Sequence, residues 1–206
     1  MRVSTLLDYL VSSELASLAG NDITKEVNLN KMLNYVNRAM AEVNKELLLN
    51  QVTYAIALVP EQTRYTINDD KLIKIIAGYN SLGLELHLNN SEDIETTLFI
   101  PEYNTVEYYG LNKASATVQD FLSVVYLKGF STIATDMDTL NINEGMTECI
   151  ASYVGYLAHS ALPKNSGNVA NAYFQKYLAI VAKTKELNIV PERLYGSIKL
   201  DTRGFV

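Results

Sequence analysis

The chain has 206 residues, of which 48% are hydrophobic and 19% are charged, a composition typical of a globular protein with one large domain or two small ones. Its net charge of −6 argues against a general nucleic-acid-binding protein, which would carry a basic face. The single cysteine excludes an internal disulfide, and no segment reaches the roughly 18 apolar residues that a membrane-spanning helix needs. We therefore expect a soluble protein that is made in the cytoplasm and has no membrane partner.

Two amphipathic helices are predicted in the first part of the chain. Apolar residues recur at steps of three and four between residues 3 and 18, and again between residues 29 and 47. Ser4 or Thr5 is expected to cap the first helix, because their side chains can accept a hydrogen bond from its free N–H groups. We assign residues 1–50 to the N-terminal helices of a bundle.

Residues 51–142 are predicted to form a β-rich module. The segments VTYAIALVP and RYTIN flank a turn and indicate a hairpin, and the segments KLIKIIAGYN, LELHLNN, TVEYYGL and LSVVYLKGF indicate further strands. A short helix is expected between about Asn90 and Phe99, with Pro101 ending it. The module should therefore be a small, mostly antiparallel sheet.

A helical hairpin is predicted over residues 143–187. One apolar stripe runs from Met146 to Leu162 and a second from Val169 to Ala182, with the turn PKNSG between them. The short turn requires an antiparallel pair, which packs most economically on the two N-terminal helices. The predicted fold class is α+β: an antiparallel helical bundle of two N-terminal plus two C-terminal helices, an inserted small antiparallel β module and an extended C-terminal arm.

The extended C-terminal arm, residues 188–206, reads NIVPERLYGSIKLDTRGFV. A proline and two glycines argue against a helix, yet the segment is too apolar to be left in water. It should lie on a partner or fold back on the chain's own helices, and the sequence leaves both open. The residues that we predict to bind a partner are Ile189, Val190, Arg193, Leu194, Tyr195, Ile198, Lys199, Leu200, Arg203, Phe205 and Val206.

The arm carries two patterns that are typical of a docking segment. Ile198 and Leu200 alternate with Lys199 and Asp201, which suits a strand added to a neighbour's sheet or an apolar edge laid in a groove. The basic residues of the arm also make it slightly positive on an otherwise acidic chain, which suits an acidic neighbour.

No catalytic site is predicted. Cys149 and His159 fall on the same predicted helix, but ten residues separate them by about 15 Å along its axis. Cys149 lies on the apolar stripe, where we expect it in the core, and His159 lies on the polar edge, where we expect it in solvent or at an interface. Phosphate-binding glycine loops and the usual hydrolase and zinc-protease motifs do not occur in the sequence.

No metal site and no cofactor are predicted either. His87 stands beside Glu85 on one predicted strand, but a zinc site needs a third and a fourth ligand, and the whole chain contains only two histidines and one cysteine. The acidic residues Asp136, Asp138 and Glu144 lack the spacing and the glycine of a calcium-binding EF-hand loop.

The order of several segments resembles a known family. Two N-terminal helices are followed by VPEQTRYTIND and later by the tyrosine-rich EYYGL. Next come VVYLKGFSTIATDMDTLNINEGMTECIASYVGYLAHSAL, with a Thr-Asp-x-Asp-x-Leu loop before a helix, and then NVANAYFQKYLAIVAKTKEL. This order is similar to that of the head-to-tail adaptor (tail-tube connector) proteins of short-tailed bacteriophages, and the resemblance covers most of the chain.

The resemblance implies a structural protein of the virion neck or tail, made in the host cytoplasm, rather than an enzyme. Members of this family form a ring, usually of twelve subunits, beneath the portal. The implied partners are further copies of the chain, the portal protein, a downstream tail or nozzle protein, and DNA that passes through the lumen without specific binding. A wall that DNA passes should be acidic or neutral, and the loop candidates for it are Asp69, Asp70, Glu92, Asp93, Asp136 and Asp138.

Two other functions stay open from the residues alone. One is a small hydrolase that uses Cys149 or a carboxylate pair brought together by the fold, and the other is a cellular protein-binding module. Oligomeric state would discriminate among the three, because only the adaptor function requires a closed ring.

Overall fold

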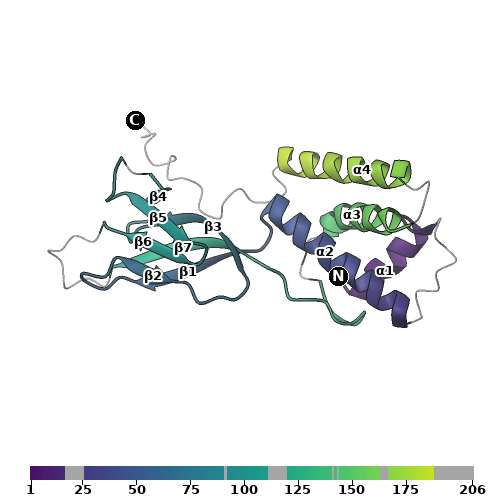
Figure 1. Ribbon diagram of the computed structural model, residues 1–206, viewed down its shortest axis with the longest axis horizontal. Coiled ribbons are helices and arrows are strands. Elements are labelled where there is room, and N and C mark those ends of the chain that lie inside the picture. The colour runs from purple at the N-terminus through teal and green to yellow at the C-terminus, as the bar shows by residue number, and fades with distance from the viewer. Residues whose placement is uncertain are drawn as a thin grey trace, which may run out of the picture. The chain divides into compact units, whose positions relative to one another are not determined.

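The computed structural model of the chain describes residues 1–16, 26–90, 92–110, 120–140, 142, 144–162 and 167–187. These residues form two compact units, each with its own hydrophobic core (Figure 1). The helical unit comprises the described residues of 1–49 and 130–187, and the β unit comprises those of 50–129.

The helical unit contains α1 (Val3–Ser12), α2 (Glu26–Leu47), the short 3₁₀-helix η2 (Glu144–Met146), α3 (Thr147–Ser160) and α4 (Gly167–Glu186). Helices α3 and α4 run side by side (Figure 1). All four α-helices contribute to one core because each carries an apolar stripe at helical spacing. Fully buried members of this core include Leu6, Leu10, Val36, Val43, Ile150 and Val154.

Helix α1 begins on backbone groups from a distant loop. The N–H groups of Val3 and Ser4 donate to the carbonyl oxygens of Asp138 (3.0 Å) and Asp136 (2.9 Å). The N-cap residue is Arg2, and its side chain makes no capping hydrogen bond. The prediction that Ser4 or Thr5 caps the helix was therefore wrong: the free N–H groups of the first turn are satisfied by the loop instead.

The β unit contains one mixed sheet with the strand order β1-β7-β3-β4-β5-β6-β2. Neighbouring strands are antiparallel except β4 and β5, which are parallel. Alternate side chains of each strand point to one face, and on β7 this places Leu122, Val124 and Tyr126 in the core. The strands are β1 (Gln51–Ala57), β2 (Arg64–Thr66), β3 (Leu72–Tyr79), β4 (Glu85–Leu88), β5 (Thr97–Glu102), β6 (Thr105–Tyr108) and β7 (Phe121–Lys128).

The predicted fold class was wrong in its β part. The described residues form four α-helices and a seven-stranded mixed sheet that closes into a nearly complete barrel, instead of a helical bundle with a small antiparallel insertion. The expected hairpin does not form either. Although β1 and β2 are consecutive in the sequence, β1 pairs with β7 and β2 pairs with β6, so the two strands form opposite edges of the sheet.

The expected short helix between Asn90 and Phe99 was also wrong. The carboxylate of Asp93 accepts hydrogen bonds from the backbone N–H groups of Glu95 (3.1 Å) and Thr96 (3.4 Å), as a helix cap would. A turn follows instead of a helix, because such local hydrogen bonds serve turns and caps equally. The chain then enters β5, where Pro101 lies at an irregularity in the pairing with β6.

Candidate interaction surfaces

The structure places Cys149 in the core of the helical unit, as predicted. Its side chain is fully buried, and burial raises the pKa of the thiol to about 12. A thiol with such a pKa stays protonated at neutral pH, so it is a poor nucleophile. His159 lies ten residues further along the same helix, and the fold does not bring the two side chains together.

The predicted position of His159 was wrong. The ring is only 3% exposed and stacks on Tyr173 of α4, with 5.1 Å between the ring centroids. Its Nε2 lies 3.3 Å from the carbonyl oxygen of Glu14, which follows α1. This histidine therefore joins helices within the helical unit instead of facing solvent.

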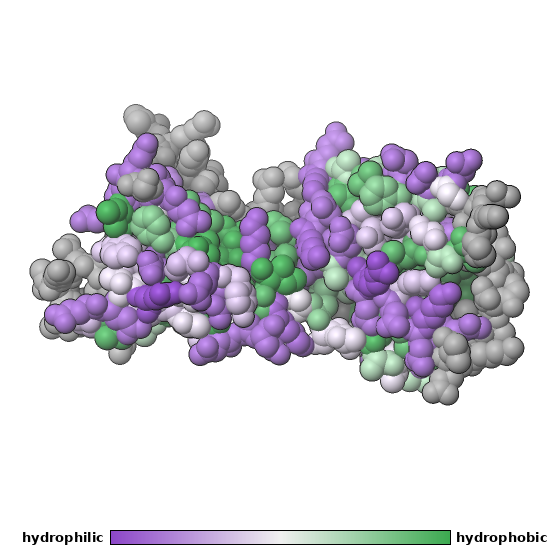
Figure 2. All heavy atoms as spheres, in the orientation of Figure 1, coloured by the Kyte–Doolittle hydropathy of each residue, from purple (hydrophilic) through white to green (hydrophobic). Residues whose placement is uncertain are grey.

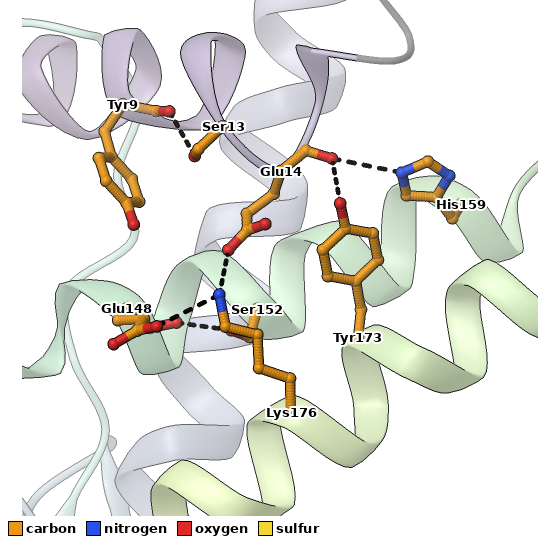
Figure 3. Close-up of polar contacts among 8 residues, drawn as sticks. All are labelled: Tyr9, Ser13, Glu14, Glu148, Ser152, His159, Tyr173 and Lys176. Atoms are coloured by element: carbon orange, nitrogen blue, oxygen red, sulfur yellow. Dashed lines mark hydrogen bonds and ion pairs between the residues drawn. The ribbon is translucent and has the colours of Figure 1, made fainter.

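Glu14 is the centre of the cluster that contains His159 (Figure 3). Its carbonyl oxygen also accepts a hydrogen bond from the Tyr173 hydroxyl at 3.0 Å. Its carboxylate, on a residue that is 7% exposed, accepts from the Lys176 ammonium at 2.9 Å. Glu148 of α3 contacts the same ammonium at 3.2 Å. The end of α1 is thus fastened to α3 and α4 through one buried residue.

Electrostatics support a structural role for the Glu14 cluster. The hydrogen bond from Lys176 to Glu14 raises the pKa of the lysine, against the opposing effect of burial. Burial raises the pKa of Tyr173, and the charge of Glu14 adds to this effect. Each buried polar group has a partner of matching chemistry, as expected for a cluster that fixes helices in place.

A second polar cluster lies in the β unit, around Asp69. The Asp69 carboxylate accepts hydrogen bonds from the Tyr126 hydroxyl (2.6 Å) and from the Lys71 backbone N–H (3.0 Å), and it pairs with the Lys128 ammonium at 2.7 Å. The hydrogen bond from Lys128 is the largest of the effects that lower the Asp69 pKa to about 2. These contacts join the β2–β3 turn to β7.

The acidic residues predicted for a DNA-facing wall fall in two groups. Asp69 is neutralised by Lys128, and Asp138 accepts from the backbone N–H groups of Ala134 (2.8 Å) and Thr135 (3.0 Å). The other members are Asp70, Glu92 and Asp93, which are exposed, and Asp136, which is partly exposed. His87 and Glu85 are exposed on β4, and among the described residues no three histidine, cysteine or acidic side chains are grouped to hold a metal ion.

The acidic charge of the chain is concentrated in the β unit. Residues 50–129 carry ten acidic and five basic residues, a net charge of −5, whereas residues 188–206 carry two acidic and three basic residues, a net charge of +1. A strongly acidic surface attracts basic segments and repels phosphate groups. The two segments are therefore complementary in sign.

Several apolar side chains of the β unit reach the surface (Figure 2). At one end of the barrel, where β1 ends and β7 begins, Ala57 pairs with exposed Phe121, and the Ser81 hydroxyl donates to Asp120 at 3.1 Å. Exposed apolar residues of the adjoining turns are Val59, Leu82 and Leu84. Grouped apolar side chains on a surface favour binding to another protein.

All of the predicted partner-binding residues, from Ile189 to Val206, lie outside the described residues. No helix in the described part of the chain is long and apolar enough to cross a membrane.

The family model for the SU10 adaptor protein matches residues 1–194. The chain belongs to the SU10 adaptor protein family. This confirms the resemblance to phage head-to-tail adaptors that the order of segments indicated. No protein in a search of curated sequences matches the chain.

Membership in this family identifies the chain as a structural phage adaptor and a virion component of the head-tail junction. An adaptor interacts with other components of the virion, and the family implies the portal and tail proteins as such partners. The surfaces of the adaptor therefore bear on its function more directly than the buried polar clusters, which stabilise the two units.

Two features of the adaptor were missed from the sequence. Glu14 interrupts an apolar run near the N-terminus, and an acidic residue on an apolar stripe is a sign of a buried ion pair, although its partner Lys176 lies 162 positions away. Among the described strands β1 pairs only with β7, and this edge position was missed because the strand was expected to pair with β2.

Proposed function

We propose that this adaptor forms a closed ring beneath the portal. DNA passes through the lumen of the ring without specific binding. One face of the ring docks on the portal and the other receives a downstream tail or nozzle protein. The match to an adaptor family over residues 1–194 carries this proposal. Head-to-tail contacts in a ring need two different surfaces on each subunit, and our candidates for them are the C-terminal arm and the β unit, whose segments carry net charges of opposite sign.

The C-terminal arm is the chief contact segment in this proposal. Residues Ile198 and Leu200 provide the apolar contacts, and Arg193, Lys199 and Arg203 complement an acidic neighbour. The net charge of −5 on residues 50–129 supports this pairing of charges, because every copy of the chain presents such a surface.

The lumen wall is acidic or neutral in this proposal, because a basic wall would bind phosphates and slow the DNA. The candidates that remain after Asp69 and Asp138 are assigned to structural contacts are the exposed Asp70, Glu92 and Asp93 and the partly exposed Asp136. A ring structure in which lysine and arginine side chains line the pore would refute this part.

Electron microscopy of purified portal, mixed with the adaptor, tests the ring directly. We expect additional ring density on one face of the portal, and all of this added density should follow one rotational symmetry. The free adaptor serves as the control, since a ring that closes only at the correct angle needs the portal as a template. Absence of the chain from the neck, or a globular dimer elsewhere in the virion, would overturn the proposal.

Deletion of residues from Ile189 onward tests the arm. We expect the truncated chain to stay folded, by circular dichroism, and to lose assembly on the portal. A chain with Lys183→Gln and Lys185→Gln, two basic residues of α4, controls for a simple loss of positive charge. Unfolding of the truncated chain would indicate an arm packed on its own helices, and assembly without the arm would refute both possibilities.

A further inference from the structure

The outer edge of β1 presents backbone groups that no described strand pairs with. Adjacent hydrogen bonds, from the Leu58 N–H to Asp120 and from the Lys128 N–H to Asn50, show that the even-numbered residues of β1 bond to β7. In an antiparallel pair the intervening residues direct their N–H and C=O groups the other way. The backbone groups of Thr53, Ala55 and Ala57 therefore point away from β7.

The strand itself lacks two of the features that usually protect an exposed edge strand. The strand QVTYAIA contains no charged residue and no proline over its seven residues. The opposite edge of the sheet, β2, is only three residues long. Arg64 of β2 is held by Glu102 (2.6 Å) and lies 3.8 Å from Glu107, so charged side chains flank that edge.

The core-facing side of β1 is incompletely covered. Ile56 points into the core and is 7% exposed, whereas Tyr54, on the same face two residues earlier, is 36% exposed. Residues of one strand separated by two share a face, so the difference arises from what lies beside them. A further strand along β1 would bring apolar side chains next to Tyr54 and would extend the nearly closed barrel.

We propose that residues 197–201 of a second copy of this chain add to the outer edge of β1 as an extra strand. Ile198 and Leu200 then share the core-facing side with Tyr54, while Lys199 and Asp201 lie on the outer side with Ala55. The arm is net positive and the receiving unit is net negative. The sheet edge supplies backbone hydrogen bonds, and the alternation selects which face of the arm turns inward.

This inference rests on the proposed ring and specifies its subunit contact. The donor surface, the arm, and the acceptor surface, the β1 edge, are different parts of the same chain. Such a contact is heterologous, so each subunit donates to one neighbour and accepts from the other, which is the arrangement that a ring requires.

Disulfide cross-linking between two distinguishable copies tests the contact. An affinity-tagged chain carries Thr53→Cys, Ala55→Cys or Ala57→Cys, and an untagged chain carries Asp201→Cys, both with Cys149→Ala. The three positions allow for different registers, since residues directly opposite on neighbouring strands share a face and lie close enough for a disulfide. Mixed on the portal, the chains should form a tagged–untagged dimer under mild oxidation. His87→Cys, at an exposed position on β4 in the middle of the strand order, is the control and should not cross-link.

The outcomes separate this inference from the proposed function. A ring on the portal without these cross-links would overturn the strand contact and leave the ring standing. A disulfide that forms only within one chain, measured with Ala55→Cys and Asp201→Cys in the same copy, would assign the arm to its own sheet and overturn the exchange between copies. Absence of any ring would overturn both.

A second set of variants tests the hydrogen-bonding edge and the arm. Ala55→Pro removes an outward N–H and should weaken ring assembly about tenfold or more, whereas Ala55→Ser, which keeps the N–H at the same position, should leave it unchanged. Thermal unfolding of each free variant verifies that it folds. On the arm, Leu200→Asp should abolish assembly and Lys199→Asp should reduce it much less, because only Leu200 faces the core. Equal losses within either pair would contradict the proposed strand.

Discussion

The helical unit and the β unit are held together by different kinds of contact. In the helical unit, contacts between distant parts of the sequence hold the elements together: Glu14 with Lys176, and the Asn37 side chain with both backbone groups of Ile133 at 2.8 and 2.9 Å. In the β unit the corresponding contacts join a turn to a strand of the same sheet, as between Asp69 and the side chains of Tyr126 and Lys128. These contacts do not involve the outer edge of β1.

This difference indicates a division of labour. Buried polar contacts across helices fix a single arrangement, because a broken one leaves a charge or a donor unsatisfied. A sheet with an uncharged open edge is prepared for another strand. An adaptor of the head-tail junction needs both properties, a rigid body and a surface that is completed by a neighbour. If the two units differ in this way, a substitution in one unit should change the stability of that unit more than that of the other.

The largest expected effect comes from truncating one core at a time. Ile150 of the helical unit and Leu98 of the β unit are both fully buried, so Ile150→Ala and Leu98→Ala should each cost about 2–5 kcal/mol of stability. Hydrogen exchange measured by mass spectrometry should show faster exchange mainly in the unit that carries the substitution. Equal loss of protection in both units would show that they unfold as one, and would remove the basis of the comparison.

A smaller effect is expected from the ion pairs of α4. Lys176→Met leaves the buried Glu14 carboxylate without its ammonium partner and should cost about 1–3 kcal/mol. The lower end of this range is expected because Lys176 is itself 40% exposed and water screens its charge. Lys185→Met is the matched control, since the Lys185–Glu46 pair is exposed on both sides and should contribute less than about 1 kcal/mol. The free energy of unfolding in urea distinguishes the two, and equal losses would contradict the role given to Glu14.

The raised pKa of Lys176 also predicts how this stabilisation changes with pH. Its pKa is raised above 10.5 in the folded chain, so the stabilisation is fully present below pH 10.5 and is lost as pH rises through the folded value. The unfolding free energy of the unsubstituted chain should therefore decline at strongly alkaline pH more steeply than that of Lys176→Met.

The helices were the more predictable part of the molecule. Apolar side chains at steps of three and four identify a helix from its own residues, so the stripe containing Cys149 is buried where it was expected. Burial of His159 was not predictable, because its partners, Glu14 and Tyr173, come from other helices. Val11 lies on the predicted stripe of the first helix, yet it is exposed.

The sheet was less predictable, because strand pairing is decided between segments far apart in the chain. Six of the seven described strands were predicted from their residues, whereas β5 was taken for the end of a helix. The pairing was not predicted, because the partner of β1 is β7, about 70 residues later. The turn at Asp93 has the composition of a helix start, and only the following strand decides between the two structures. The arm was predicted to be a contact segment from its composition alone, whereas the acceptor that we propose for it could be named only from the strand order of the sheet.

Removing the hydroxyl group of a buried tyrosine should have opposite effects on stability in the two units, and both effects should be small. The Tyr177 hydroxyl of the helical unit is buried and has no hydrogen-bond partner in the described part of the chain, whereas the Tyr126 hydroxyl of the β unit donates to Asp69 at 2.6 Å. Tyr177→Phe should leave stability unchanged or raise it by up to about 1 kcal/mol, and Tyr126→Phe should lower it by about 1 kcal/mol. Thermal unfolding measures both, and a clear loss in Tyr177→Phe would reveal a partner for that hydroxyl.

The smallest effect concerns acid, and it should be confined to the β unit. The pKa of Asp69 is lowered from 3.8 to about 2, mainly by the hydrogen bond from Lys128 and then by that from Tyr126. A lowered pKa means that the stabilisation is present above about pH 4 and is lost as pH falls toward 2. Stability of the β unit, followed by hydrogen exchange of its strands, should therefore decline between pH 4 and pH 2. Asp69→Asn should remove most of this decline, because an amide does not titrate and cannot form the charged pair with Lys128. Asp70→Asn, in the same turn but exposed, is the control and should keep the pH dependence of the unsubstituted chain. A decline that survives in Asp69→Asn would place the acid-sensitive carboxylate elsewhere in the sheet, and a decline of equal size in the helical unit would show that acid does not distinguish the two units.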